Sequence, residues 1–92
     1  MPLTFQRTRG HNFRTGAYLF DMLDSGAVVQ CGVSDEAMDD AERRHDVKAH
    51  ERDAQFERLK DAILACASQK YFAGQLEQSE PRVLVKTADL TP

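Results

Sequence analysis

A possible metal-binding set lies in the segment EAMDDAERRHDVKAHE. Its Glu42 and His45 form an E-x-x-H unit, and His50 follows. A carboxylate-bridged metal pair in a helix bundle needs two such units and two further acidic ligands, whereas this chain has one unit. His45 and His50 are five positions apart, which does not align them on one helical face. We therefore predict a hydrated segment between helices and no bound metal, and keep these three residues as the alternative metal-binding set.

The two cysteines are the candidates for a catalytic nucleophile. A reactive thiol needs a neighbouring base or a positively polarised helix start, and no motif places Cys31 or Cys66 beside either. Both lie in apolar contexts, so we expect small core residues with free thiols, as a reducing compartment keeps them. The five glycines are dispersed, and none forms a phosphate-binding loop. We therefore expect no enzyme activity and no cofactor.

Three arginines near the start of the chain could contact a polyanion. Arg7, Arg9 and Arg14 lie in the stretch QRTRGHNFRTG, which has no acidic residue. Neutralising a few phosphates would give weak and strongly salt-dependent binding to nucleic acid. The whole chain has a formal net charge of -3, however, and charged side chains on a short edge strand also discourage pairing with other molecules. We favour the charged edge strand and keep nucleic-acid binding as the alternative.

The length and composition fit one small globular domain over residues 1–92. Apolar residues make up 41% of the chain and charged residues 29%, which is neither disordered nor fibrous composition. The longest apolar runs, such as AVVQCGV, are far shorter than the roughly 20 residues that cross a bilayer. The opening MPLTFQRTRGHN lacks the pattern of a secretory signal. We expect a cytoplasmic protein that does not associate with a membrane.

A β-hairpin over residues 17–33 is the clearest element. Its two apolar arms flank Asp24, Ser25 and Gly26, residue types that tolerate a tight reversal. Alternation along the arms predicts one core face. That face comprises Tyr18, Phe20, Met22, Ala27, Val29, Cys31 and Val33. We expect further short strands around residues 3–5 and over residues 82–86, with Phe13 in another short strand or a turn.

Two helices should follow the hairpin. Ser34 is a good N-cap for a short helix over about residues 35–43. The segment HERDAQFERLKDAILACASQKYFAG predicts a long helix that ends at Gly74. Its apolar stripe comprises Phe56, Leu59, Ile63, Cys66, Ala67, Lys70 and Tyr71.

Together these elements predict an α+β fold of two layers. An antiparallel sheet of three to four strands, made of the hairpin and the N- and C-terminal strands, would be covered by one long and one short helix. The other sheet face carries a second set of apolar residues, Leu19, Leu23, Val28 and Leu84. If these residues form one patch, a partner or a second copy of the protein would cover it.

Four parts of the sequence together resemble a known family. They are the N-terminal LTF, the segment VVQCGVSDEAM, the helix positions Phe56, Ile63, Ala67, Tyr71 and Gly74, and the terminal RVLVKTADL. Their order and spacing are similar to those of short, mainly proteobacterial proteins known as a domain of unknown function. The resemblance implies a small α+β fold and a cytoplasmic bacterial setting, and it brings no activity to transfer. We expect a non-enzymatic interaction module that meets a protein partner or forms a homodimer.

Overall fold

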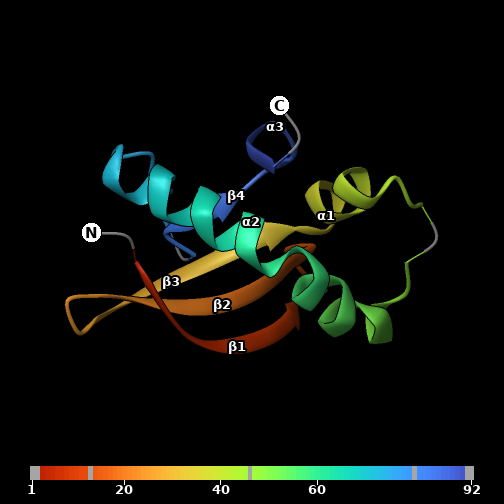
Figure 1. The fold of residues 1–92 in the computed structure, drawn as a ribbon, viewed down its shortest axis with the longest axis horizontal. Helices are drawn as coiled ribbons and strands as arrows, with labels where there is room; N and C mark the ends of the chain where they lie inside the picture. The colour runs from red at the N-terminus through yellow and green to blue at the C-terminus, as the bar shows by residue number, and fades with distance from the viewer. Residues whose placement is uncertain (1–2, 13, 46, 80, 91–92) are drawn as a thin grey trace.

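The residues that the computed structural model describes, 3–12, 14–45, 47–79 and 81–90, form an α+β fold (Figure 1). In chain order its elements are β1 (Thr4–Asn12), β2 (Ala17–Asp24), β3 (Ala27–Ser34), α1 (Asp35–Glu42), the 3₁₀ helix η1 (Ala49–Glu51), α2 (Arg52–Phe72), β4 (Val83–Val85) and α3 (Thr87–Leu90). None of the helices in these described ranges is long and apolar enough to cross a membrane.

The sheet is mixed, with the strand order β1-β2-β3-β4. β1 pairs with β2 and β2 with β3 in the antiparallel direction, but β4 runs parallel to β3. The predicted α+β class is confirmed, and the prediction of a wholly antiparallel sheet was wrong at the last strand. A parallel neighbour requires a long crossover, and α2 with the connection after it carries the chain back so that β4 enters in the direction of β3.

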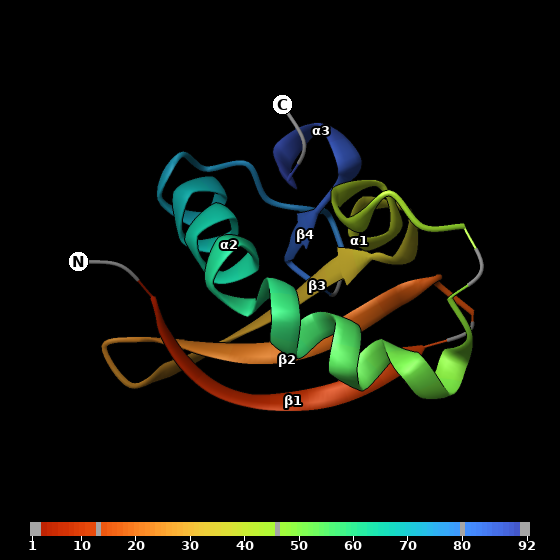
Figure 2. The same cartoon turned by 45° about the vertical axis from the view of Figure 1, so that its right-hand side comes forward.

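The predicted hairpin is confirmed, with Asp24 opposite Ala27. The two loop residues, Ser25 and Gly26, have φ angles of 51° and 92°, the positive pair that a type I′ turn requires. Tyr18 and the other predicted core residues of the hairpin are buried, with one exception. Ala27 is exposed, because the end of the hairpin projects beyond the neighbouring elements (Figure 2).

β1 is one strand of nine residues that covers the length of β2. The pairing register shifts between Phe5 and Arg7 and again between Thr8 and Gly10. These irregularities explain why the sequence did not predict a continuous strand: they interrupt the alternation that a regular strand shows. The predicted second short strand or turn at Phe13 lies outside the described residues.

Both predicted helices are present. The Ser34 hydroxyl accepts a hydrogen bond of 3.1 Å from the Ala37 amide and so caps α1, as expected. Gly74 follows the end of α2 with a φ of 76°, the left-handed conformation that glycine adopts without strain. The four-residue α3 was not predicted, because it is too short to show a helical period. There the Asp89 carboxylate accepts a hydrogen bond of 2.9 Å from the Lys86 amide.

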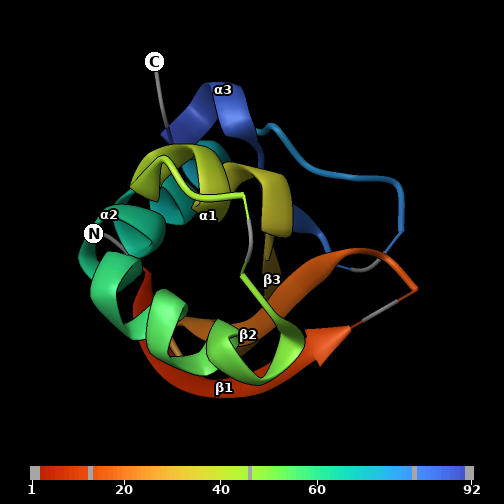
Figure 3. The same cartoon turned by 90° about the vertical axis from the view of Figure 1, so that its right-hand side faces the viewer.

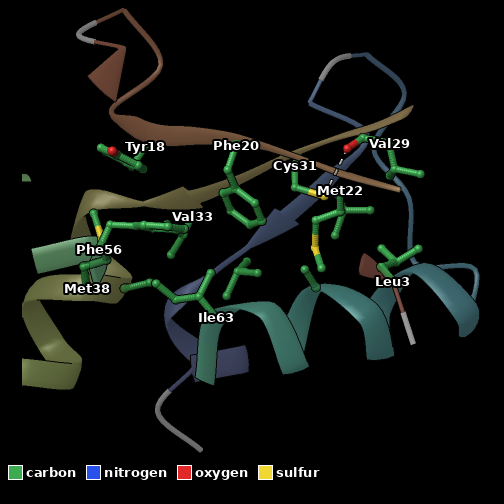
Figure 4. Close-up of a cluster of buried hydrophobic side chains, with 14 residues drawn as sticks. Leu3, Tyr18, Phe20, Met22, Val29, Cys31, Val33, Met38, Phe56 and Ile63 are labelled. Carbon is green, nitrogen blue, oxygen red and sulfur yellow. Dashed lines mark hydrogen bonds between the residues drawn. The ribbon is translucent and has the colours of Figure 1, made fainter. Parts of the chain in front are cut away.

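The helices lie on the concave side of the sheet (Figure 3). The core lies between α2 and the sheet, where the side chains of the two layers point toward one another (Figure 4). The Phe56 ring of α2 stacks on Tyr18, with ring centroids 4.7 Å apart, and packs against Phe20 at 5.2 Å. Ile63 and Ala67 continue the buried stripe of α2. Among the described residues, no helix covers the other face of the sheet (Figure 3).

We predict that Phe56→Ala lowers the free energy of unfolding by about 3–5 kcal/mol, because it removes a fully buried ring and leaves a cavity between the layers. Urea unfolding followed by circular dichroism measures this change. Asp61→Ala, on the exposed side of α2, is the control and should change stability by less than about 0.5 kcal/mol. Equal effects of the two substitutions would contradict the packing described above.

Candidate interaction site

Two of the three N-terminal arginines bind one carboxylate of the protein itself. The Asp21 side chain, which is fully buried, accepts a hydrogen bond of 3.0 Å from Arg7 Nε and one of 2.8 Å from Arg9 Nε. Asp21 lies on β2, directly opposite Arg7. Its neighbours Phe20 and Met22 point into the core, so the Asp21 side chain points to the other face of the sheet. The shift in register between Thr8 and Gly10 allows Arg9 to reach the same carboxylate.

The pKa of Asp21 reflects this arrangement. Burial favours the neutral acid, but the hydrogen bonds and charges of Arg9 and Arg7 outweigh it and lower the pKa below its usual value. Asp21 is therefore ionised at neutral pH and cancels one of the two arginine charges. β1 is thus an edge strand, and two of its arginines pair with Asp21. That these charges discourage pairing with other molecules stays a prediction.

Arg14 is exposed and lies beyond the end of β1. Its amide donates a hydrogen bond of 2.9 Å to Asn12 Oδ1, which shapes the turn. Arg9 and Arg14 line the same shallow depression, with Asn12 and Leu19 beside them. The structure thus brings two of the predicted polyanion contacts together, while Arg7 and Arg9 share the carboxylate of Asp21.

The predicted metal candidates do not converge. The Glu42 carboxylate binds the Arg58 guanidinium through two hydrogen bonds, of 2.7 and 2.9 Å, and Arg58 lowers the pKa of Glu42. His45 and His50 are exposed in and beside the connection between α1 and α2. Within the described part of the chain, no group of three or more His, Cys, Asp or Glu side chains is placed to hold a metal ion.

Both thiols are in surroundings that disfavour the thiolate. Cys31 is buried, and burial, helped by the charge of Asp21, raises its pKa to about 12. Cys66 is half-buried, and burial together with the Asp89 carboxylate raises its pKa as well. A thiol that stays protonated at neutral pH is a poor nucleophile.

A polar cluster that the sequence did not predict joins α1 to the start of α2. Arg52, nine-tenths buried, donates hydrogen bonds of 2.7 Å to Asp39 and to Gln55, and Gln55 donates one of 3.1 Å to Asp39. Asp35 at the start of α1 binds His11 Nε2 at 2.7 Å and lies 3.7 Å from Arg52 Nε. Because these contacts connect β1, α1 and α2, we assign the cluster to holding the helices in place.

The predicted apolar face is split into two parts. A Cβ atom at Gly32 would lie 3.1 Å from Leu19 Cδ2 and 3.5 Å from Leu84 Cδ1, so these leucines lie together above Gly32. Leu23 and Val28 are opposite each other at the hairpin end of the sheet. Between the two pairs lie the buried Asp21 with its arginines, and Gln30 opposite it. The four residues therefore do not form the single patch that we considered.

The exposed large hydrophobic side chains of the described residues gather near the hairpin end instead. Val28, Phe72 and Leu76 are 53%, 54% and 40% exposed. Val28 and Leu76 line a groove of about 360 Å³. We call it the hairpin-end groove; its lining residues are Val28, Val29, Gln30, Tyr71, Leu76 and Arg82. Phe72 extends this surface and packs edge-on against the Tyr71 ring at 5.1 Å.

The sequence indicated Val28 but not Phe72 or Leu76. Phe72 directly follows Tyr71, the last residue of the apolar stripe of α2, and so falls beside that stripe. Leu76 is a single leucine in the polar connection after Gly74. The sequence signal that could have indicated this surface was a large apolar residue outside the apolar stripe of α2, followed a few residues later by another in a polar connection.

These features define a small α+β protein whose helices cover one face of a mixed sheet and whose exposed apolar side chains lie in and beside a groove at one end. The chain belongs to DUF1488, a family of proteins of unknown function, which it matches over residues 3–81. The terminal RVLVKTADL, which contributed to the resemblance in sequence, lies beyond the matched residues.

The fold is also similar to a solved structure. A crystal structure of a DUF1488-family protein of unknown function from Shewanella loihica PV-4 superimposes with a TM-score of 0.80, covering 90% of each chain at 13% sequence identity. A comparison with curated proteins finds no match. At this identity the likeness concerns the fold alone.

We predict that Asp21→Asn lowers the free energy of unfolding at pH 7 by about 1.5–3 kcal/mol, because the arginines lose a charged acceptor. The pKa of Asp21 is lower in the folded protein, so its contribution is present above the unfolded value of about 3.9 and disappears as the pH falls through the folded value. Urea titrations between pH 7 and pH 2 should show the wild type and the variant converging at acid pH.

The matched control for this prediction is Asp61→Asn, which removes an exposed carboxylate from α2. It should change stability by less than about 0.5 kcal/mol at pH 7. A constant difference between wild type and Asp21→Asn across the whole pH range would refute the role given to the ionised carboxylate.

Proposed function

We propose that this protein is a non-enzymatic, cytoplasmic protein-interaction module, and that its contact surface is the hairpin-end groove with Phe72 beside it. The observation that carries the proposal is that the exposed large hydrophobic residues of the described chain lie together: Val28 and Leu76 line one groove, and Phe72 packs against Tyr71 in its wall. Exposed apolar side chains that cluster mark a binding surface, whereas scattered ones are ordinary.

The chemistry of the polar residues supports a binding role over a catalytic one. The raised pKa values of Cys31 and Cys66 leave both as thiols at neutral pH. Asp21, Asp39 and Glu42 have lowered pKa values because arginines of the same chain bind them, so each is already committed to an internal ion pair. A general acid or base works best with a pKa near the operating pH, which these carboxylates do not have.

The proposal predicts contact-specific cross-linking in cells. We expect a photo-reactive benzoylphenylalanine in place of Phe72 to give discrete cross-linked products, because this side chain is half exposed beside the groove. The same group in place of Asp61, on the exposed side of α2, should give none. Immunoblotting detects the products, and mass spectrometry distinguishes another protein from a second copy of this chain.

The variant Val28→Glu is the test of the surface itself. A charge at this half-exposed position should strongly reduce the Phe72 products while leaving the free energy of unfolding within about 0.5 kcal/mol of wild type. Sedimentation velocity over a range of concentrations shows whether the wild type self-associates and whether Val28→Glu or Leu19→Glu abolishes it. Identical cross-linking from Phe72 and Asp61 would overturn the proposal.

Nucleic-acid binding through Arg7, Arg9 and Arg14 is the second candidate. The observation that favours it is that Arg9 and Arg14 line one depression. Its weakness is that Asp21 neutralises part of this charge. A metal site at Glu42, His45 and His50 has less support, because Arg58 occupies the Glu42 carboxylate.

Fluorescence anisotropy with a labelled single-stranded oligonucleotide tests this second candidate. Binding through the arginines should weaken steeply from 50 to 200 mM salt, roughly tenfold if two phosphates are neutralised, and should disappear when all three arginines are changed to alanine. Asp21→Asn should strengthen it, because it removes the carboxylate that Arg7 and Arg9 share. No anisotropy change at 50 mM salt would eliminate this candidate.

A further inference from the structure

The outer edge of β3 has no neighbouring strand at its hairpin end among the described residues. β4 pairs with Cys31–Val33, and β3 begins four residues earlier, at Ala27. The two-residue turn fixes the direction of the backbone groups there. Ladder hydrogen bonds start at the residues that flank such a turn and alternate, so Val28 and Gln30 direct their N–H and C=O groups away from β2.

β4 cannot extend to cover this edge. Pro81 lies two residues before β4 and has no amide hydrogen to donate, and its ring packs over the open face, 3.2 Å from the position of a Cβ atom at Gly32. The connection between α2 and β4 forms a closed loop, because the Glu77 amide donates a hydrogen bond of 2.7 Å to the Arg82 carbonyl. Because Val83 lies opposite Cys31, its amide takes the outward carbonyl of Gln30 into the β3–β4 ladder. Among the described residues, the part of the edge that stays open therefore runs from Ala27 to the Gln30 amide, roughly 10 Å at about 3.3 Å per residue.

The hairpin-end groove runs beside this open edge. Val28, Val29 and Gln30 form one wall, and Tyr71, Leu76 and Arg82 come from α2 and the connection that follows it. The Tyr71 hydroxyl donates a hydrogen bond of 2.7 Å to Asp24, which holds the ring at the hairpin end. An extended chain in this groove would find backbone partners on one side and apolar side chains on the other.

Arg82 gives the groove a preferred charge. Of the residues that line the groove, Arg82 carries a positive charge. No carboxylate of the described residues forms an ion pair with Arg82. It precedes Val83, which pairs with Cys31, so its charge lies near the Gln30 end of the open edge. A carboxylate on an incoming chain would meet the arginine there, and such pairs are favourable where water is partly excluded.

We propose that an extended, acidic segment of a partner protein binds in the hairpin-end groove as an added strand. Its backbone bonds to the amide and carbonyl of Val28 and to the Gln30 amide, an apolar side chain packs on Val28 and Leu76, and a carboxylate pairs with Arg82. Strand addition of this kind takes affinity from main-chain hydrogen bonds and specificity from alternate side chains. This inference rests on the proposed function, because it names the partner of the same groove.

A second copy of this chain is the competing occupant. A second copy could pair with β3 through the same open edge of its own β3, which would bring a second Arg82 and no groove carboxylate. It could also pair through β1, the other long edge of the sheet. β1 carries Arg7 and Arg9 and has two irregularities in register, so it would bring positive charge toward Arg82 and would not form a regular ladder. Charge complementarity therefore favours an acidic partner.

The test is a selection from a phage-displayed library of random ten-residue peptides on the purified wild-type protein. We expect enriched peptides with alternating apolar residues and at least one Asp or Glu. The most enriched peptide is synthesised with a fluorescent label, and its Kd is measured against the wild type, Arg82→Glu and Arg14→Glu. Arg82→Glu should weaken binding at least about tenfold, whereas the exposed Arg14 is the matched control and should change Kd less than about twofold.

Two further measurements locate the peptide. When the peptide is added, the amide chemical-shift changes in the protein should centre on Val28 and Gln30. The amide signals of the rest of the protein should stay where they are. A peptide methylated at the backbone nitrogens of its central residues should lose binding, because it can no longer donate to the strand edge.

Several outcomes would overturn the proposal. These are no enrichment over the uncoated support, enriched peptides without a carboxylate, equal affinity for wild type and Arg82→Glu, shifts centred away from β3, or a stable dimer that protects the Val28 and Gln30 amides. Cross-linking from Phe72 to another protein together with any of these results would retain the interaction module and reject the added strand. Loss of the cross-linking as well would reject both.

Discussion

The packing of α2 across one face of the sheet is the constraint on which the rest of the structure depends. A chain of this length can build a single apolar core, and here that core needs both layers: the strands supply Tyr18 and Phe20, and the helix supplies Phe56. Because the helices of the described residues lie on that side, the side chains of the opposite face must themselves make that face compatible with water.

The open face meets this requirement in two ways. At its centre, the buried carboxylate of Asp21 is paired with two arginines of β1, whose polar side chains lie over it. At one end, Leu19 and Leu84 close over Gly32, where the absence of a side chain leaves room for them. The apolar surface that remains is small and lies at the other end, around Val28. The proposed contact surface thus lies at the end of the face where apolar side chains are not packed against other residues of the protein.

The short span of β4 leaves room for the groove. This strand arrives after a crossover and a proline and, among the described residues, pairs with only Cys31–Val33. The residues before it, Leu76 and Arg82, become a wall of the groove instead of a strand. A short terminal strand therefore leaves both an open backbone edge and the side chains that would select what binds there.

The sequence by itself determined the elements whose signals are local. The hairpin followed from Asp24, Ser25 and Gly26 between alternating apolar arms, α1 from the Ser34 cap, and α2 from its apolar stripe and Gly74. Each signal lies within a few residues of the structure it specifies, because turn conformation, capping and side-chain period are properties of neighbouring residues.

Only the tertiary structure decided how distant residues combine. The direction of β4 depends on where α2 delivers the chain, and the pairing of Arg7 and Arg9 with Asp21 depends on the register of two strands. The groove joins β3 to the end of α2 and the connection before β4, which follow β3 some forty residues or more later in the sequence. Such contacts are set by the packing of whole elements against a common core, and no local pattern of residues encodes them.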